Sequence, residues 1–161
     1  MASPQRLPAE GNTQRRRLLC GALGALAAAF TRPARAAATH ADATAMAQAR
    51  RQAMAWAAQM RRRAVASGDQ AFGAVIVRNG KLVGEGPSRV VVNDDPTAHA
   101  EMEAIRDAAR RLGGRDLAGC ELYATSMPCP MCQTAAYWAN LDRIYVGPQA
   151  EDTGPPRYGR C

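Results

Sequence analysis

The sequence predicts one α/β domain in which helices cover a mixed β-sheet. Asn79-Gly80 separates two strand-like runs, which is a strong hairpin signal because both turn positions tolerate positive φ. Beyond this hairpin, strand-like and helix-like segments alternate, and such alternation is typical of a layered sheet with helices on its faces. A chain of 161 residues is long enough to bury this core without disulfides.

Local patterns predict each element in turn. From Thr44 to Ala66 the apolar residues recur every three or four positions, which predicts a helix that Gly68 ends. The predicted stripe consists of Met46, Ala49, Ala53, Trp56, Met60 and Ala64. The hairpin strands are expected over 72–78 and 81–85.

The second half is predicted to continue with two helices and two strands. Asp95-Pro96 supplies an N-cap and a first-turn proline for a helix that runs to Leu112, where Gly113 closes it. The later elements are a strand over 120–125, a helix over 130–139, a strand over 143–146 and an irregular tail over 148–161.

The positive charge is concentrated at the N-terminus. The whole chain has 21 Lys+Arg, 14 Asp+Glu and a net charge of +7. Residues 1–36 hold six arginines and one acid, which is +5, so the remaining residues carry only +2. A protein that binds polynucleotides needs a more basic body, so nucleic acid is not an expected partner.

Residues 1–36 have the organisation of a cleavable bacterial signal peptide. Arg15-Arg16-Arg17 precedes an apolar run over 18–30, and Ala34-Arg35-Ala36 offers a small-x-small cleavage site. Paired arginines followed by two leucines resemble the twin-arginine type of signal. We therefore expect export by the twin-arginine machinery and a periplasmic or secreted mature protein. The apolar run is too short for an uncleaved membrane span.

Four residues in the second half form a pattern with chemical meaning. His99 and Glu101 open one predicted helix, and Cys129 and Cys132 open another. One imidazole and two thiolates make three ligands for Zn²⁺ and leave the fourth position for water, as in catalytic zinc sites. A helix start also favours the thiolate form of cysteine. Glu101 is then the spare carboxylate, suited to carrying protons.

Two other interpretations of the cysteines remain open. Cys129 and Cys132 have the spacing of a thioredoxin-like redox pair, and they also suit a structural zinc site. A redox pair of that type normally follows the first strand of its fold. It would also leave His99 and Glu101 without a role, whereas catalytic zinc uses all four residues.

The paired motifs H-x-E and P-C-x-x-C resemble the signature of the zinc-dependent cytidine/deoxycytidylate deaminase-like superfamily. The likeness runs from about Phe72 to Gly147 and points to its guanine deaminase and tRNA adenosine deaminase branch. The stretches that carry it are Phe72-Gly73-Ala74-Val75, Asn93-Asp94-Asp95-Pro96-Thr97-Ala98-His99-Ala100-Glu101, Pro128-Cys129-Pro130-Met131-Cys132 and Ala136-Tyr137-Trp138-Ala139.

The resemblance implies a fold and an assembly. The expected domain is a three-layer α/β/α sandwich with a mixed central sheet over residues 37–147, and the protein is expected to be a homodimer. The segment after this domain is shorter than in guanine deaminases, so we expect a C-terminally shortened member in which residues 148–161 serve as a reduced lid, a partner subunit covers the pocket, or the site is open.

The resemblance also implies hydrolytic release of ammonia from a free nucleobase or related amino-heterocycle, with guanine as the first guess. Zinc would activate water, and Glu101 would move its proton to the ring and to the leaving amine. The alternatives are a nucleoside deaminase, a tRNA adenosine deaminase, and a non-enzymatic zinc-binding or redox module.

Four residues are implied to contact substrate: Phe72, Ser88, Ala100 and Trp138. Two positions depart from the pattern of the family. Ser88 stands where relatives carry a substrate-binding asparagine, and Met127 stands where a glutamate often precedes the P-C pair. A hydroxyl in place of an amide predicts different recognition of the base.

Overall fold

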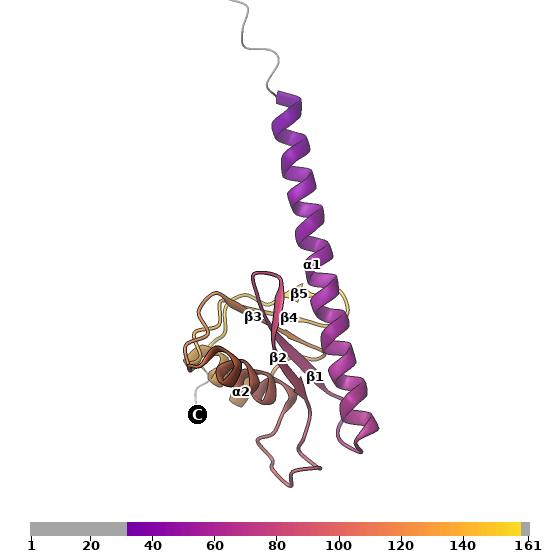
Figure 1. Ribbon diagram of the computed structural model, residues 1–161, viewed down its shortest axis with the longest axis vertical. Helices are drawn as coiled ribbons and strands as arrows, with labels where there is room; N and C mark the ends of the chain where they lie inside the picture. The colour runs from indigo at the N-terminus through magenta and orange to yellow at the C-terminus, as the bar shows by residue number, and fades with distance from the viewer. Residues whose placement is uncertain (1–31, 159–161) are drawn as a thin grey trace, which may run out of the picture. The chain divides into compact units, whose positions relative to one another are not determined.

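The computed structural model describes residues 32–158, with side chains from Ala41 onward. All contacts below belong to the compact unit that starts at Ala38. The elements in chain order are α1 (Arg32–Ala66), β1 (Gly73–Arg78), β2 (Lys81–Pro87), α2 (Ala100–Leu112), β3 (Cys120–Ala124), α3 (Pro130–Trp138), β4 (Arg143–Val146) and β5 (Glu151–Asp152) (Figure 1).

The described strands form one mixed sheet in the order β2-β1-β3-β4-β5. The hairpin pair β1–β2 and the pair β1–β3 are antiparallel, β3–β4 is parallel across α3, and β4–β5 is antiparallel. Asn79 and Gly80 both have positive φ, at 51° and 72°, as the predicted hairpin turn requires. The predicted mixed sheet is therefore confirmed.

Side chains alternate between two cores on the two faces of the sheet. Ala74 and Ile76 of β1 belong to a cluster that contains the inward alanines of α2 and Ala136 of α3. Val75 and Val77 face the opposite way and pack with residues of α1. Since α1 and α2 cover opposite faces (Figure 1), the arrangement is the predicted three-layer α/β/α sandwich.

The buried face of α1 covers only the later part of the predicted stripe. Its fully buried residues are Ala53, Ala57, Met60 and Ala64, with Met54 beside them. The prediction was wrong for Met46, which is 59% exposed, and for Ala49. Both residues precede the part of the helix that packs on the sheet. An apolar residue there has no neighbouring surface against which it could be buried.

The predicted start of α2 was also wrong. Asp95 Oδ1 accepts the backbone N–H and the hydroxyl of Thr97, each at 2.7 Å, but this capping supports only a turn. The carbonyl of Ala98 accepts the N–H of Arg89 at 3.0 Å, and His99 has an extended backbone with ψ 153°. The helix therefore begins at Ala100, and residues 88–98 form a loop.

A short strand lies in the segment predicted to be irregular. Glu151 and Asp152 pair with Val146 and Tyr145 of β4. The pairing continues beyond the strand, since Thr153 N–H donates to the carbonyl of Ile144 at 3.0 Å. An exposed two-residue strand has no hydrophobic alternation, so only its tertiary pairing reveals it.

Two glycines of β2 allow α2 to approach the sheet closely. A Cβ at Gly86 would overlap the carbonyl oxygen of Ala100 and lie 2.5 Å from the nitrogen of Ala104. A Cβ at Gly84 would lie 2.8 Å from the Cβ of Ala108. The absence of a side chain at these positions therefore allows the backbone of α2 to pack directly against β2.

Gly86→Ala is expected to destabilise the fold by about 1–3 kcal/mol, because the helix must move away from the strand. Gly114→Ala is the matched control, since a Cβ there meets nothing within 4 Å, and its expected cost is within about 0.5 kcal/mol. Urea unfolding of both variants checks this. Equal stability of Gly86→Ala and the parent protein would show that α2 is not seated by this contact.

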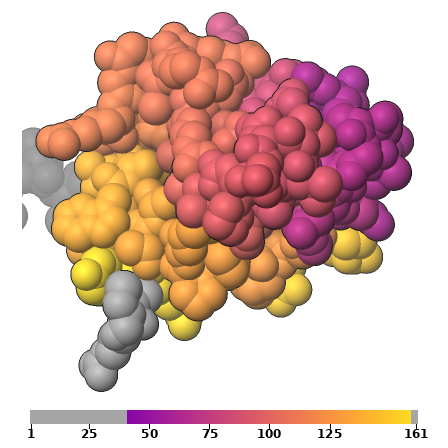
Figure 2. All heavy atoms as spheres, turned by 90° about the horizontal axis from the view of Figure 1, so that it is seen from below, coloured from indigo at the N-terminus to yellow at the C-terminus, as the bar shows by residue number. Residues whose placement is uncertain are grey.

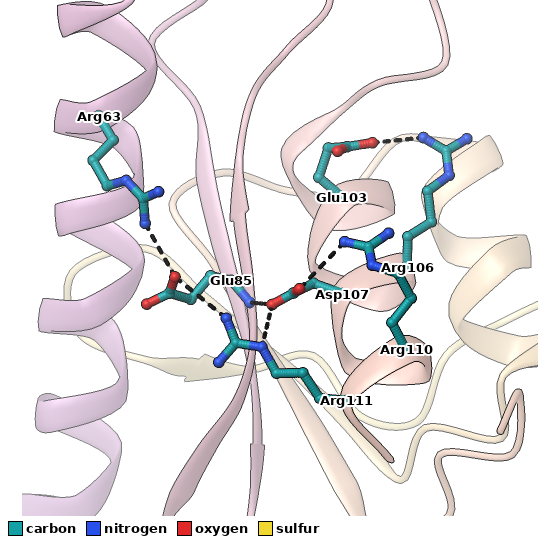
Figure 3. Close-up of polar contacts among 7 residues, drawn as sticks. All are labelled: Arg63, Glu85, Glu103, Arg106, Asp107, Arg110 and Arg111. Carbon is teal, nitrogen blue, oxygen red and sulfur yellow. Dashed lines mark hydrogen bonds and ion pairs between the residues drawn. The ribbon is translucent and has the colours of Figure 1, made fainter. Parts of the chain in front are cut away.

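A polar network joins α1, β2 and α2 at the surface (Figure 3). Glu85 accepts Arg63 of α1 at 3.1 Å and Arg111 of α2 at 3.5 Å. Asp107 accepts the backbone N–H of Glu85 at 2.9 Å and the side chain of Arg111 at 2.8 Å. The ion pairs are partly exposed, so each contributes little alone, but the network holds the helices across the sheet edge.

The predicted signal peptide lies largely outside the described residues, which begin at residue 32. It therefore stays a prediction. Within residues 32–158, no helix combines the length and the apolar character needed to cross a membrane.

Candidate active site

The site is built at the N-termini of α2 and α3, which cover the same face of the sheet. His99 is the N-cap residue of α2 and Cys129 is the N-cap residue of α3, both with extended backbones. Pro130 at the start of α3 fits the first turn, where no N–H is needed. Cys132 follows one turn later, so it shares the helix face of Cys129.

Three ligand atoms meet at these helix starts. His99 Nδ1 lies 3.7 Å from the sulfur of Cys129 and 3.7 Å from that of Cys132, and the two sulfurs are 3.6 Å apart. Around one tetrahedral zinc, ordinary bond lengths give edges of about 3.8 Å between sulfurs and about 3.6 Å between sulfur and nitrogen. The triangle therefore fits a zinc ion with one open position.

The surroundings of Cys132 disfavour a thiolate that has no cation beside it. Burial, the nearby carboxylate of Glu101 and Cys129 raise the pKa of the Cys132 thiol far above its usual range. A divalent cation supplies the charge that a buried thiolate needs.

Glu101 lies beside the ligand triangle without belonging to it. Its side chain is buried, and its Oε2 lies 3.5 Å from the sulfur of Cys132. It also lines the cavity that adjoins the triangle. A carboxylate beside a metal centre and open to a cavity is placed to move protons between water and a bound molecule.

The cavity at the triangle measures about 390 Å³. Three of the four predicted substrate contacts, Phe72, Ser88 and Ala100, line it together with His99 and Glu101. This volume lies within the range of small-molecule sites. The structure thus brings the candidate metal ligands, Glu101 and these three residues to one place.

Trp138 is not brought to this cavity. It is 66% exposed and lines a separate hollow with Ile105, Arg106 and Asn140. Its ring packs edge-on against Tyr137 and Tyr158. Within this chain it therefore lies with the surface aromatic cluster and not with His99.

Sequence reasoning missed two lining residues and one supporting residue. Gln70 and Ser126 line the cavity, as does Met127, which the sequence singles out only as a departure. Gln70 precedes the first strand and Ser126 follows the third. The only sequence signal for either residue was that it lies close in the chain to a motif residue, Phe72 or Cys129. The supporting residue is Asp69, which is 9% exposed and contacts the 88–98 loop.

The 88–98 loop joins Ser88, which lines the cavity, to His99. In Figure 2 it is the pink surface between the purple side chains of α1 and the amber side chains of the second half of the chain. It is closed by the bond from Arg89 N–H to the carbonyl of Ala98 and leads directly into His99. Its conformation therefore positions both Ser88 and a metal ligand.

A match to a protein-family model shows the family of this chain. Residues 47–148 match the model described as the cytidine and deoxycytidylate deaminase zinc-binding region. The chain belongs to this family. Membership agrees with the zinc geometry of the three ligands and places the matched region over all of α2, β3, α3 and β4.

Relatives within this deaminase family include two kinds of enzyme. Guanine deaminase from Bacillus subtilis is 46% identical over 81 residues, which are 50% of this chain and 52% of the relative. A tRNA-specific adenosine deaminase from Aquifex aeolicus is 42% identical over 83 residues, 52% of this chain and 55% of the relative. The chain thus spans about half the length of these curated relatives.

A solved structure gives the same picture of the fold. The crystal structure of Bacillus subtilis guanine deaminase has a TM-score of 0.58 and 40% identity to this chain, and the match covers 60% of this chain and 62% of that one. The predicted cytidine deaminase-like α/β fold is therefore confirmed.

Proposed function

We propose that this protein is a zinc-dependent hydrolytic deaminase of a free nucleobase or a related amino-substituted heterocycle. The observation that carries the proposal is the placement of Glu101 beside both the three-ligand triangle and the cavity of about 390 Å³, which is large enough for a small molecule. Guanine is the first substrate to test, because a guanine deaminase is 46% identical over 81 residues.

The residues divide the chemistry among themselves. His99, Cys129 and Cys132 would hold the zinc, which lowers the pKa of a coordinated water to about 7 and so supplies the nucleophile. Glu101 would accept one proton from the attacking water and pass it to a ring nitrogen, and would then pass the second proton of that water to the departing amine. Water and the amino-heterocycle thereby give ammonia and the corresponding carbonyl compound.

The walls of the cavity favour an uncharged base over a phosphorylated substrate. The described residues that line it include Gln70, Phe72, Ser88, Ser126 and Met127, but no lysine or arginine. A nucleotide or a polynucleotide substrate is normally held by basic side chains at its phosphates. The single carboxylate on the wall, Glu101, would also repel a phosphate placed near it.

Ammonia release from the zinc-loaded full-length protein tests the proposal. The panel comprises guanine, adenine, cytosine, their nucleosides, aminotriazines and a tRNA. Release from guanine or another free base is the expected result. Release from tRNA alone would favour the tRNA adenosine deaminase alternative, and no release from any compound would favour a non-enzymatic zinc or redox module.

Export is part of the same proposal and is supported by the sequence of residues 1–36. The twin-arginine route carries folded proteins, so the ligands would acquire zinc before they meet an oxidising compartment, where free thiols form disulfides. Cell fractionation tests this step. Mature protein in the periplasm or medium is expected, and protein found only in the cytoplasm contradicts it.

A further inference from the structure

The positive charge of the chain after residue 36 is concentrated on α1. Residues 37–66 hold five arginines and one acid, which is +4, whereas residues 67–161 hold ten bases and twelve acids, which is −2. The small total of +2 therefore combines a basic helix with a slightly acidic remainder. Positive charge gathered on one element attracts anions to it.

Three of these five arginines have no partner for their charge. Arg63 pairs with Glu85 at 3.1 Å (Figure 3), and the guanidinium group of Arg50 lies 4.7 Å from the centre of the Tyr145 ring. Among the described residues, no ion pair or hydrogen bond engages the side chains of the other three, which are Arg51, Arg61 and Arg62. All three are exposed, so they are free to bind a ligand.

Two of the unpaired arginines line a hollow of about 430 Å³ beside α1. The lining residues are Arg51, Met54, Ala55, Ala58 and Arg61 of α1, together with Thr125 after β3 and Pro148 after β4. Arg51 and Arg61 are ten positions apart, which is about 15 Å along a helix. They therefore stand at the two ends of the hollow, with a floor of small and apolar side chains between them.

Thr125 supplies a third donor at the Arg61 end. Its Oγ1 accepts the backbone N–H of Gly73 at 3.1 Å, and its own N–H donates to the carbonyl of Gly73 at 3.0 Å. The hydroxyl proton remains to be donated, since no described residue accepts it. A Cβ at Gly73 would overlap the backbone nitrogen of Arg61. Arg61 and Thr125 are thus held against the same residue, so little backbone ordering is needed when a ligand binds.

The charge of this hollow is uncompensated, unlike that of two other hollows in the described chain. No carboxylate lines it. The cavity at the ligand triangle contains Glu101 and no base, and the hollow beside Trp138 contains Arg106 and Arg115 together with Asp116. Every polar side chain at the α1 hollow can donate a hydrogen bond, so the hollow suits an anion. Guanidinium groups match phosphate in particular, through paired N–H donors.

We propose that the α1 hollow is a second binding site, which takes a small organic phosphate. Arg61 and Thr125 hold the phosphate group, the floor packs against the body of the molecule, and Arg51 stacks on a planar group at the far end. The site lies on the α1 face of the sheet, whereas the cavity lies at the starts of α2 and α3 on the opposite face. Its occupant is therefore a molecule other than the substrate of the proposed deaminase.

Calorimetric titration of the full-length zinc-loaded protein at low salt tests this site. The titrants are guanosine 5′-monophosphate, inorganic phosphate and guanosine. Both compounds that carry phosphate are expected to bind, and high salt should weaken their binding because it screens the arginines. Tighter binding of the nucleotide than of inorganic phosphate, by at least about fivefold, would assign an organic phosphate. Equal affinities would assign free phosphate as the ligand of the same site.

Variants of the arginines locate the bound phosphate. Arg61→Gln is expected to weaken binding of both phosphate compounds at least about tenfold, because it removes a charged donor pair. Arg51→Gln should weaken binding of the nucleotide more than that of inorganic phosphate, since it acts on the body of the molecule. Arg115→Gln is the matched control, because it removes one charge from an exposed arginine of another hollow, and it should leave both affinities within about twofold.

The outcomes do not depend on ammonia release. Phosphate that binds equally well to Arg61→Gln and to the parent protein would overturn the inference, since that phosphate would be held elsewhere, as at the zinc. No binding of either phosphate compound would overturn it too. Binding that depends on Arg61, in a protein that releases no ammonia from any base, would overturn the proposed function and leave this site standing.

Discussion

Glu101→Gln is expected to lower kcat for ammonia release by at least about 100-fold while the zinc content stays at one per chain. The amide cannot carry a proton between water, ring and amine, and general acid–base catalysis contributes about 10²–10⁴-fold. Zinc should be retained because Glu101 lies beside the ligand triangle, with its Oε2 3.5 Å from the sulfur of Cys132, and is not one of its three members. Steady-state kinetics with metal analysis on the same sample measures both quantities.

Glu103→Gln is the matched control for this variant. Glu103 lies two residues further along α2, pairs with Arg106 at 2.7 Å and does not line the cavity. Its loss should leave kcat within about twofold, since a partly exposed ion pair is worth little. A Glu101→Gln protein with full activity would remove the proton carrier from the mechanism, and loss of zinc from it would make Glu101 a ligand.

Cys132→Ala is expected to abolish zinc binding and ammonia release and to lower Tm strongly. A ligand bound at 1,000 times its Kd stabilises a fold by about 4 kcal/mol, and each kcal/mol shifts Tm by about 2–4 °C in a protein of this size. The variant should therefore unfold about 10 °C below the zinc-loaded parent. A chelator should produce a similar shift in the parent and little in the variant, which differential scanning calorimetry measures.

Cys120→Ala controls for the loss of a buried sulfur. Cys120 is fully buried in β3 and is not part of the ligand triangle. Its replacement removes packing but leaves zinc content and the chelator response intact. Zinc retained by Cys132→Ala, or lost from Cys120→Ala, would mean that the metal is held elsewhere.

The fold was predictable where local sequence and tertiary structure agree. The hairpin followed from Asn79-Gly80, and the alternation of β1 between Val75 and Ile76 matches its two covered faces. The start of α2 was not predictable, because Asp95 has the side chain of an ordinary N-cap. Only the tertiary structure shows that the carbonyl of Ala98 accepts the N–H of Arg89.

The site was predictable to the extent that its residues carry unusual chemistry. Two thiols, an imidazole and a carboxylate at helix starts indicate a metal centre, and the structure brings all four together. Gln70 and Ser126 are ordinary residues, so only the three-dimensional arrangement places them at the cavity. Trp138 lies outside that cavity and lines a separate hollow, so its contact with substrate stays a prediction.

X-ray absorption at the zinc edge, on full-length protein with measured metal content, tests the zinc centre most directly. We expect one zinc per chain with two sulfur ligands at about 2.3 Å, one nitrogen at about 2.0–2.1 Å and one further light atom. A protein without stoichiometric zinc, with Cys129 and Cys132 joined in a disulfide, would contradict it, as would a closed four-ligand protein site.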